Sequence, residues 1–331
     1  MDLTNPISIL IPCFNAERWI ADAIRSALAQ TYAPIEVIVI DDGSTDNSLD
    51  IIRRFSDRIR WETGQNRGGN PARNRLLELA RGEWVQYLDA DDYLLPDKIK
   101  SQVRILDDFP ETDVLYGRVT SETCNEHGTS HDLQIIAEPR DPWILLARWY
   151  LPQTGGPLWR KSALMDVGGW KVDQPCCQEH ELYLRLLVAG KRFTYCPHNG
   201  AIYRIWGNDT VSRRDAGAVR RQRRKILTEE ENHLRSNGEL TAPRLQAINQ
   251  ARFEMSRLAW REDRTAALEI FQDIISVDRH FVPLGNQPGG HHPPLTYRVL
   301  FRLLGFAGTE KVADQVHAFR SRFMARSRVS T

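Results

Sequence analysis

The sequence predicts an α/β protein with a doubly wound, mainly parallel sheet and a helical C-terminal extension. Two observations lead to this prediction. In the first 120 residues, short apolar runs alternate with segments of helical periodicity, a pattern typical of βαβ units. From about residue 215 onward the pattern is helical and rich in arginine. Glycine and proline then cluster between Pro283 and Pro294, which we interpret as a linker.

Strands are predicted where short apolar runs are followed by turn or acidic residues, a pattern typical of strands buried on both faces. The predicted strands are residues 7–11 (ISILI), 35–40 (IEVIVI), 58–62, 83–88 (EWVQYL) and 114–119. Between them, apolar residues recur every three or four positions, as on one face of a helix. Pro71 suits the first turn of a helix, and Gly82 suits its end. The predicted helices are residues 16–30, 48–55, 72–80, 98–108, 143–150 and 179–189.

Polar stretches follow three of the predicted strands. They are Pro12–Asn15, Asp41–Asp42 and Asp89–Asp92. Right-handed crossovers would place the loops after parallel strands on one edge of the sheet, and doubly wound sheets bind their ligands at that edge. The sequence therefore predicts a ligand site built from these three stretches.

The acidic stretch Asp89-Ala90-Asp91-Asp92 places three carboxylates within four residues. Without a partner these groups would repel one another and raise their own pKa values. A divalent cation such as Mg²⁺ or Mn²⁺ resolves the conflict, because both prefer hard oxygen ligands and can bridge a diphosphate. The alternative is a solvated acidic turn before the helix that begins near Pro96. The position after a buried strand favours the metal site.

Four other side chains at this edge have two interpretations each. Asp41 and Asp42 could accept hydrogen bonds from a base or a ribose hydroxyl, or they could cap the helix at Ser48. Phe14 could offer its face to a nucleobase, or it could pack in the core. Arg73 could neutralise a diphosphate, or it could be a surface charge.

Missing motifs exclude several function classes. The first strand is not followed by G-x-G-x-x-G, and no G-x-x-x-x-G-K-[ST] occurs, so a dinucleotide oxidoreductase and a P-loop nucleotidase are not expected. The five cysteines show no CxxC spacing, which indicates neither a disulfide framework nor a zinc site and suits the reducing cytoplasm. No apolar run approaches the roughly 20 residues of a membrane span.

Charge is unevenly distributed along the chain. From Arg213 to the end there are 21 Lys and Arg against 13 Asp and Glu, a balance of +8, whereas the preceding part has a balance of −7. The basic residues are not interleaved with aromatic ones, so we expect no nucleic-acid binding. The segment Leu295–Arg328 mixes apolar and basic positions. It could lie on the anionic inner face of a membrane, pack on the rest of the chain, or contact a second copy.

The order of these motifs resembles the family 2 glycosyltransferases of the GT-A fold, a Rossmann-like sheet. The resemblance runs from about Ile7 to Ser212 and implies a catalytic domain at residues 1–212, followed by a helical, basic region at residues 213–331. It rests on the segments ISILIPCFNAERWI, QTYAPIEVIVIDDGSTDNS, NRGGNPARN, ARGEWVQYLDADDYLLPDKI, GGW, EHELYLRLLVAG and YRIWGNDTVS.

The resemblance implies roles for individual residues. The residues implied to bind the donor are Pro12, Phe14 and Glu17 around the nucleoside, Asp42 at the base with Asp41 beside it, and Arg73 near the donor. Asp89 and Asp91 would form the DxD pair, with Asp91 as the direct metal ligand and Asp89 facing the ribose or a metal-bound water. The turns Gly155-Gly156 and Gly168-Gly169-Trp170 would face the acceptor.

Glu179 falls where the family places its catalytic base, in a segment usually written Glu-Asp. Here the pair is Gln178-Glu179. A second departure lies in the stretch Tyr203-Arg204-Ile205-Trp206, where Trp206 stands in place of a histidine that approaches the metal in the family. The third protein ligand is therefore not defined by the sequence.

The resemblance implies an inverting glycosyltransferase of polysaccharide or glycolipid biosynthesis. It would need Mn²⁺ or Mg²⁺ and would transfer a sugar from a nucleotide diphosphate donor, most commonly a UDP-sugar, to a hydroxyl of a carbohydrate or lipid-linked acceptor. We expect a cytoplasmic protein with at most peripheral membrane contact. A nucleotidyltransferase is a rival that lacks its glycine- and lysine-rich phosphate loop here. The other rival is a catalytically silent sugar-nucleotide-binding or scaffold protein of the same fold.

Overall fold

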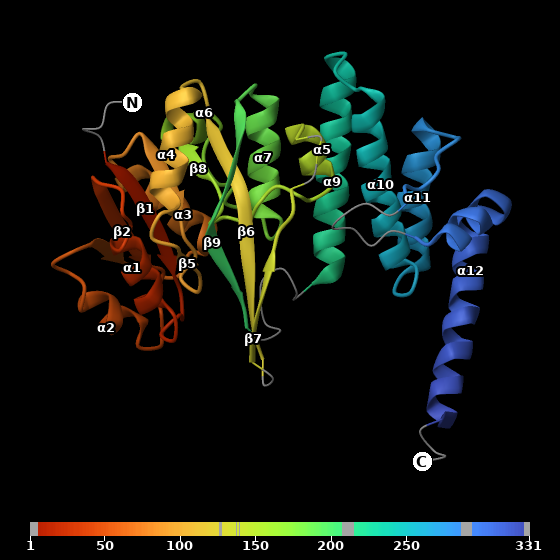
Figure 1. Ribbon diagram of the computed structural model, residues 1–331, viewed down its shortest axis with the longest axis horizontal. Helices are drawn as coiled ribbons and strands as arrows, with labels where there is room; N and C mark the ends of the chain where they lie inside the picture. The colour runs from red at the N-terminus through yellow and green to blue at the C-terminus, as the bar shows by residue number, and fades with distance from the viewer. Residues whose placement is uncertain are drawn as a thin grey trace. The chain divides into compact units, whose positions relative to one another are not determined.

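The computed structural model describes residues 6–125, 128–136, 138, 140–206, 215–285 and 293–327. They belong to two compact units, residues 1–226 and 227–331 (Figure 1). The strands of the first unit are β1 (Ile7–Cys13), β2 (Ile35–Asp41), β3 (Arg60–Thr63), β4 (Trp84–Tyr87), β5 (Tyr93–Leu94), β6 (Val114–Asn125), β7 (Gly128–Leu133), β8 (Leu158–Arg160) and β9 (Phe193–Ile205). Its helices are α1 (Ile20–Leu28), α2 (Ser48–Arg53), α3 (Gly69–Leu79), α4 (Lys98–Asp108), α5 (Pro142–Ala147), α6 (Lys161–Asp166) and α7 (Gln178–Val188).

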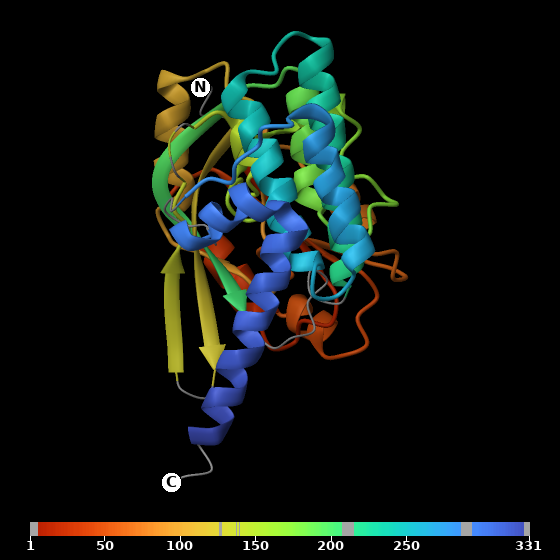
Figure 2. The same ribbon diagram turned by 90° about the vertical axis from the view of Figure 1, so that its right-hand side faces the viewer.

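One mixed sheet runs through the first unit in the order β3-β2-β1-β4-β8-β6-β9-β5, with β7 paired to β6. The predicted α/β class is confirmed, and β3, β2, β1 and β4 are parallel as expected. Strand β6 (Val114–Asn125) was predicted at residues 114–119, but the antiparallel pairings were not: β8 runs antiparallel to both β4 and β6, and β5 runs antiparallel to β9. The hairpin partner β7 escaped prediction because all its residues are exposed, so it has no apolar pattern. The β6–β7 hairpin extends beyond the parallel strands in both views, and β9 pairs with β6 along most of it (Figures 1 and 2).

Helices cover both faces of the parallel strands, which explains why these strands read as continuous apolar runs. On one face, α1 and α2 pack against Ile9, Ile11, Val37 and Val39. On the other face, where α3 packs against β1 and β2, Leu10 is also fully buried. The two-sided covering holds the carboxyl ends of β1, β2 and β4 at one rigid edge.

Helix α1 begins at Ile20, four residues later than predicted. The preceding backbone is diverted because the amides of Asn15 and Ala16 donate to the hydroxyls of Ser44 and Ser48 in the next loop. Helix α3 instead begins earlier than predicted, at Gly69. The late start of α1 therefore arises from contacts distant in the sequence, which local periodicity does not report.

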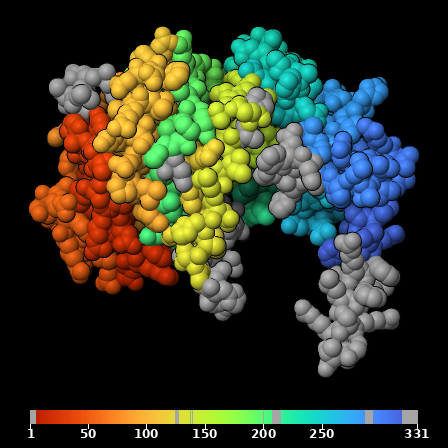
Figure 3. Space-filling view, viewed as in Figure 1, coloured from red at the N-terminus to blue at the C-terminus, as the bar shows by residue number. Residues whose placement is uncertain are grey.

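Strand β9 is held in place by close packing of α4. In the space-filling view α4 lies directly against β9 (Figure 3). The side chain of Lys98 covers Gly200 at this contact. A Cβ atom at Gly200 would overlap the Cβ and Cγ atoms of Lys98. Glycine at this position therefore lets the two elements approach, and β9 in turn carries Arg204 toward the edge of the sheet.

The second unit is helical, as predicted for this region. It contains the end of α9 (Ala216–Ser236) with α10 (Ala242–Ala259), α11 (Arg264–Val277) and α12 (Leu295–Ser327). Aromatic residues dominate its core, among them Phe253, Trp260, Phe281, Phe301 and Phe306. Gly305 has a φ of 67° and interrupts the helical geometry of α12. Among the described residues, no helix combines the length and apolar character that a bilayer crossing would require.

Candidate donor and catalytic site

The loop after β1 is fastened to the loop after β2. The amide of Glu17 donates to Asp46 (3.0 Å), and the Glu17 carboxylate accepts from the amide of Asn47 (2.9 Å). Pro12 is half-buried within β1, whereas the Phe14 side chain is 49% exposed. Of the two interpretations of Phe14, core packing is therefore wrong. Its ring remains available to a planar ligand at the carboxyl edge of the sheet.

Asp41 and Asp42 organise the backbone beside this edge. The two carboxylate oxygens of Asp42 accept hydrogen bonds from the amides of Arg67 (2.9 Å) and Gly68 (2.8 Å). Asp41 is buried and accepts from the hydroxyl of Thr63 (2.7 Å). Neither aspartate caps α2, since the Ser48 amide donates to Asp46 instead. Because a carboxylate has about four acceptor positions, Asp42 retains capacity for a ligand.

Arg73 lies at the centre of the site. It is 8% exposed, so the surface-charge interpretation is wrong. Its guanidinium donates to Asp89 (2.9 Å), to Gln178 (3.2 Å) and to Asn70 (3.2 Å). Burial acts against the charged form, but the carboxylates of Asp89 and Glu179 outweigh it and raise the pKa of Arg73. Arg73 thus joins the acidic loop after β4 to the start of α7.

The acidic loop after β4 uses its carboxylates in different ways. Asp92 is buried and accepts from the amide of Arg204 (2.8 Å), which fastens the loop to β9. Asp91 accepts from the indole N–H of Trp206 (3.0 Å). Burial, followed by the like charge of Asp89, raises the pKa of Asp91. Burial and the two neighbouring carboxylates raise the pKa of Asp92 well above its usual range.

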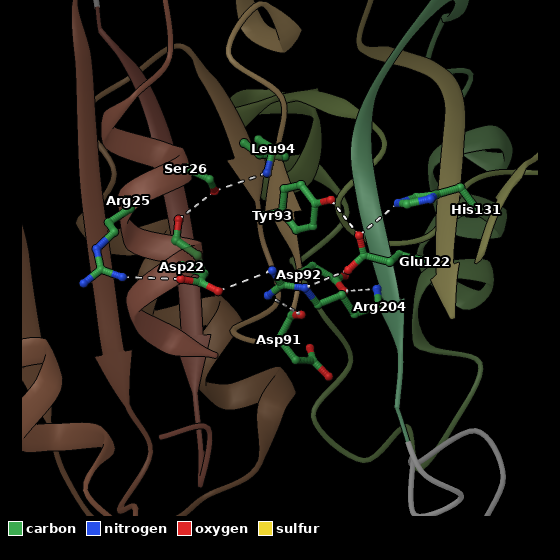
Figure 4. A network of polar contacts seen from close by, with 11 residues as sticks. Asp22, Arg25, Ser26, Asp91, Asp92, Tyr93, Leu94, Glu122, His131 and Arg204 are labelled. Atoms are coloured by element: carbon green, nitrogen blue, oxygen red, sulfur yellow. Dashed lines mark hydrogen bonds and ion pairs between the residues drawn. The ribbon is translucent and has the colours of Figure 1, made fainter. Parts of the chain in front are cut away.

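Arg204 is a central residue that sequence reasoning did not single out. Its guanidinium contacts Asp22 of α1 (3.4 Å) and Glu122 of β6 (3.2 Å), and Tyr93 also donates to Glu122 (2.9 Å) (Figure 4). The Arg204 guanidinium also lies 4.7 Å from the ring of Trp19. This network ties β9, β6 and α1 to the acidic loop. Its only sequence signal was the arginine in the YRIW stretch.

Glu179 lies in the first turn of α7, and its Oε1 accepts a hydrogen bond from the hydroxyl of Thr154. Thr154 is fully buried and precedes the Gly155-Gly156 turn. Gln86 of β4 donates to the carbonyl of Gly155 (2.8 Å), so the turn is fixed to the sheet. The structure therefore brings the turn next to Glu179, and Thr154 is a site residue that the sequence analysis missed.

The Gly168-Gly169-Trp170 turn is held by Asn74 of α3. The Asn74 side chain accepts from the amide of Trp170 and donates to its carbonyl, both at 2.7 Å. Gly169 has a φ of 68°, and a Cβ atom there would lie 2.5 Å from Asn74 Oδ1. Glycine is therefore required at this position. The turn places the Trp170 ring 4.9 Å from the Arg73 guanidinium.

His180 follows Glu179 and is buried, with its ring stacked 3.4 Å from that of Trp149. Its Nε2 has no hydrogen-bond partner among the described residues. Burial, followed by the positive charge of Arg223, holds the pKa of His180 well below its usual value. The imidazole therefore stays neutral in the folded protein, whereas it takes up a proton in the unfolded chain below about pH 6.5.

This difference predicts an acid-sensitive stability. As pH falls below about 6.5, the unfolded state binds one more proton, so the free energy of unfolding falls by up to about 1.4 kcal/mol per pH unit. His180→Phe should make the fall in the free energy of unfolding between pH 7.5 and 5.0 smaller than in the unmodified protein, as measured by urea denaturation. His198→Gln, at an exposed position, is the control and should keep the full fall. A slope in His180→Phe as steep as in the unmodified protein would contradict the assignment.

The free carboxylate oxygens of the acidic loop suit a cation that is coordinated partly by the protein and partly by a substrate. Among the described residues, no group of three or more His, Cys, Asp or Glu side chains is arranged to hold a metal. Asp89 Oδ1 accepts from Arg73 and Asp91 Oδ2 accepts from Trp206, which leaves each carboxylate one oxygen. Mg²⁺ in proteins is commonly bound by one or two carboxylates together with substrate phosphates. Asp89 and Asp91 therefore fit a divalent cation that arrives with a diphosphate.

Solved structures share this fold. The chain aligns with the crystal structure of Staphylococcus aureus TarS residues 1–349 in complex with UDP-GlcNAc, with a TM-score of 0.56 and 17% identity, over 87% of this chain and 98% of that one. A second TarS crystal structure gives a TM-score of 0.53 at 18% identity, over 87% of this chain and 59% of that one. At these identities the match shows the fold, which is that of the GT-A glycosyltransferases.

Residues 8–166 match the model of the family described as glycosyl transferase family 2. This part of the chain therefore belongs to glycosyl transferase family 2. An uncharacterised glycosyltransferase of Rickettsia felis is 38% identical over 191 residues, which are 55% of this chain and 31% of that protein.

An Escherichia coli relative named UDP-Glc:alpha-D-GlcNAc-diphosphoundecaprenol beta-1,3-glucosyltransferase WfaP is 38% identical over 112 residues, which are 33% of this chain and 43% of that protein. The matched regions cover between 31% and 52% of the lengths of the first curated relatives.

Proposed function

We propose that the protein is a metal-dependent, inverting glycosyltransferase that transfers a sugar from a nucleotide diphosphate donor to an acceptor hydroxyl. The observation that carries the proposal is the position of Arg73. It joins Asp89, at the carboxyl edge of the parallel strands, to Gln178 beside Glu179. Donor-binding and acceptor-activating groups thus meet at one edge of the sheet, where doubly wound folds bind ligands.

The donor side is assigned from the loops after β1, β2 and β4. The exposed ring of Phe14 would stack on the base, and Asp42 would accept a hydrogen bond from it. Asp89 and Asp91 would hold Mn²⁺ or Mg²⁺, whose charge stabilises the leaving diphosphate. Uridine is our proposed base, which agrees with the UDP-sugar in the name of the relative WfaP.

Glu179 is assigned as the general base. Its Oε1 is held by Thr154, which leaves Oε2 to take the proton of the acceptor hydroxyl. A fixed carboxylate within hydrogen-bond reach of the reacting hydroxyl is the geometry that general-base catalysis requires. Attack on the sugar carbon from the face opposite the diphosphate inverts the anomeric configuration. Gln178, neutral and bonded to Arg73, contributes position rather than charge.

A donor-hydrolysis assay tests the proposal. The protein is incubated with UDP-glucose or UDP-GlcNAc and either Mn²⁺ or EDTA, and the release of UDP is measured. We expect slow release that requires the metal and stops in Glu179→Gln. Glu181→Gln is the matched control, since Glu181 lies in the same first turn but is paired with Arg185 (2.8 Å). Release that is equal in EDTA would contradict the metal-dependent mechanism.

A catalytically silent sugar-nucleotide-binding protein is the second candidate. It is favoured by the indole N–H that occupies one oxygen of Asp91 and by the neutral Gln178. In that case UDP with Mn²⁺ would raise the melting temperature, but no donor would be hydrolysed or transferred. The same assay therefore separates the two functions.

We further propose that the acceptor is lipid-linked and that α12 contacts an anionic membrane. Leu295, Val299 and Leu303 are 72%, 50% and 75% exposed and recur every four residues along the helix. The exposed Arg302 lies beside Leu303. Apolar residues flanked by arginine suit an interface between headgroups and acyl chains. The acceptor named for the relative WfaP carries diphosphoundecaprenol.

Liposome flotation tests this contact. With vesicles that contain phosphatidylglycerol, the double substitution Leu295→Ser and Leu303→Ser should weaken binding at least about tenfold, because each buried leucine contributes roughly 1.5–3 kcal/mol. Leu258→Ser, at an exposed position of α10, should bind like the unmodified protein. Equal flotation of the double variant would contradict the membrane contact. If the unmodified protein is a dimer and the double substitution dissociates it, the apolar residues Leu295, Val299 and Leu303 would instead form a contact with a second copy of the chain.

A further inference from the structure

We propose that Trp206 is a positioning residue that fixes Asp91 and makes cation binding depend on the diphosphate. This inference rests on the proposed function, because it concerns the same carboxylate. Its first basis is the hydrogen bond from Trp206 Nε1 to Asp91 Oδ2 (3.0 Å). An indole is a donor only, so Trp206 directs the carboxylate but cannot itself bind a cation.

The indole is held by its surroundings rather than free on the surface. Its ring lies 5.9 Å from that of Trp19 at an interplanar angle of 46°, and Trp19 lies 4.7 Å from the guanidinium of Arg204. The Arg204 amide donates to Asp92. Trp206 is 36% exposed, and this scaffold gives its N–H a defined direction toward Asp91.

The fixed indole limits what the protein alone offers a cation. Asp91 retains Oδ1, and the neighbouring Asp89 has one oxygen bonded to Arg73. Mg²⁺ requires near-octahedral coordination, and Mn²⁺ also prefers oxygen ligands. Two carboxylate oxygens do not complete such a shell, so diphosphate oxygens and water must supply the rest. The cation and the nucleotide then strengthen each other's binding, since coupling between two ligands is reciprocal.

Substitutions at residue 206 separate the two roles of the indole. Trp206→Phe keeps an aromatic ring but removes the donor, whereas Trp206→Glu replaces the donor with a carboxylate beside Asp91. Trp206→Gln is the matched neutral control for the glutamate. Trp61→Phe, in β3, controls for the loss of an indole elsewhere in the unit. Binding of Mn²⁺ is read from the electron paramagnetic resonance signal of the free ion, with and without UDP.

For the unmodified protein we expect weak binding of Mn²⁺ alone and at least about tenfold tighter binding with UDP. Trp206→Glu should bind Mn²⁺ alone about tenfold or more tightly than Trp206→Gln, so its dependence on UDP shrinks. Trp206→Phe should weaken Mn²⁺ binding in the presence of UDP by about three- to tenfold, the size of one lost hydrogen bond. Trp61→Phe should change neither the affinity for Mn²⁺ alone nor the affinity for Mn²⁺ in the presence of UDP.

The arm with Mn²⁺ alone tests the placement of residue 206 independently of any nucleotide. If Trp206→Glu gains Mn²⁺ affinity while no protein binds UDP, the position of Trp206 is supported and the proposed function is contradicted. If UDP binds with Mn²⁺ but Trp206→Glu and Trp206→Phe both behave like the unmodified protein, the inference about Trp206 is overturned and the proposed function stands.

Discussion

Replacement of Glu179 with glutamine is expected to abolish sugar transfer while the donor remains bound. Glutamine keeps the length of the side chain and an oxygen that can accept from Thr154, but it cannot take a proton from the acceptor hydroxyl. Loss of a general base typically lowers the rate 10²- to 10⁴-fold. The measurement compares turnover by released UDP with donor affinity by isothermal titration calorimetry in Mn²⁺.

Two controls make this result specific. Glu181→Gln should retain turnover, because Glu181 bonds to Arg185 through both carboxylate oxygens instead of lining the site. Thr154→Val should lower turnover less than Glu179→Gln, since it removes the hydrogen bond that positions the base but not the base itself. Retained turnover in Glu179→Gln, or lost donor affinity, would remove Glu179 from its assigned role.

Replacement of Asp91 with asparagine is expected to remove the dependence of donor binding on the metal. The amide oxygen can still accept from Trp206, so the local structure should persist, but the negative charge is lost. Loss of even a supporting partner of a metal ligand typically costs 10- to 100-fold in metal affinity, so loss of the ligand charge itself should cost at least as much. The affinity for UDP is measured by calorimetry in Mn²⁺ and in EDTA.

The unmodified protein should bind UDP far more tightly in Mn²⁺ than in EDTA, and Asp91→Asn should show nearly equal values. Asp97→Asn is the control: Asp97 is exposed and bonded to Thr31 (2.6 Å) outside the acidic loop. An unchanged metal dependence in Asp91→Asn would mean that other atoms hold the cation. Asp91 would then no longer be assigned as the ligand of the cation at the donor site.

The sequence predicted the parallel part of the fold because those strands are buried on both faces and leave an uninterrupted apolar signature. It could not predict β5 and β8, which are short and pair with strands far along the chain, or β7, whose residues are all exposed. Strand β9 is long, but its middle includes Pro197 and Gly200, and both are unusual within strands. Propensity therefore failed where tertiary pairing decides the structure.

The candidate site shows the same division. Asp89, Asp91 and Arg73 could be identified because they follow a strand or begin a helix in an ordered set of motifs. Thr154 and Arg204 could not, because their importance comes from side-chain contacts with Glu179 and with the acidic loop. Sequence position indicates which edge of the sheet a residue reaches, but it does not reveal which neighbour it will bond there.

The bonds made by Arg73 have a consequence for how the protein would evolve and be engineered. Because one guanidinium bonds to both Asp89 and Gln178, the position of the acidic loop is linked to the position of the start of α7. Under the proposed function, a change near Asp89 that adapts the site to a new donor would also move the start of α7, and with it the proposed base Glu179. We therefore expect a change of donor to need compensating substitutions around this arginine.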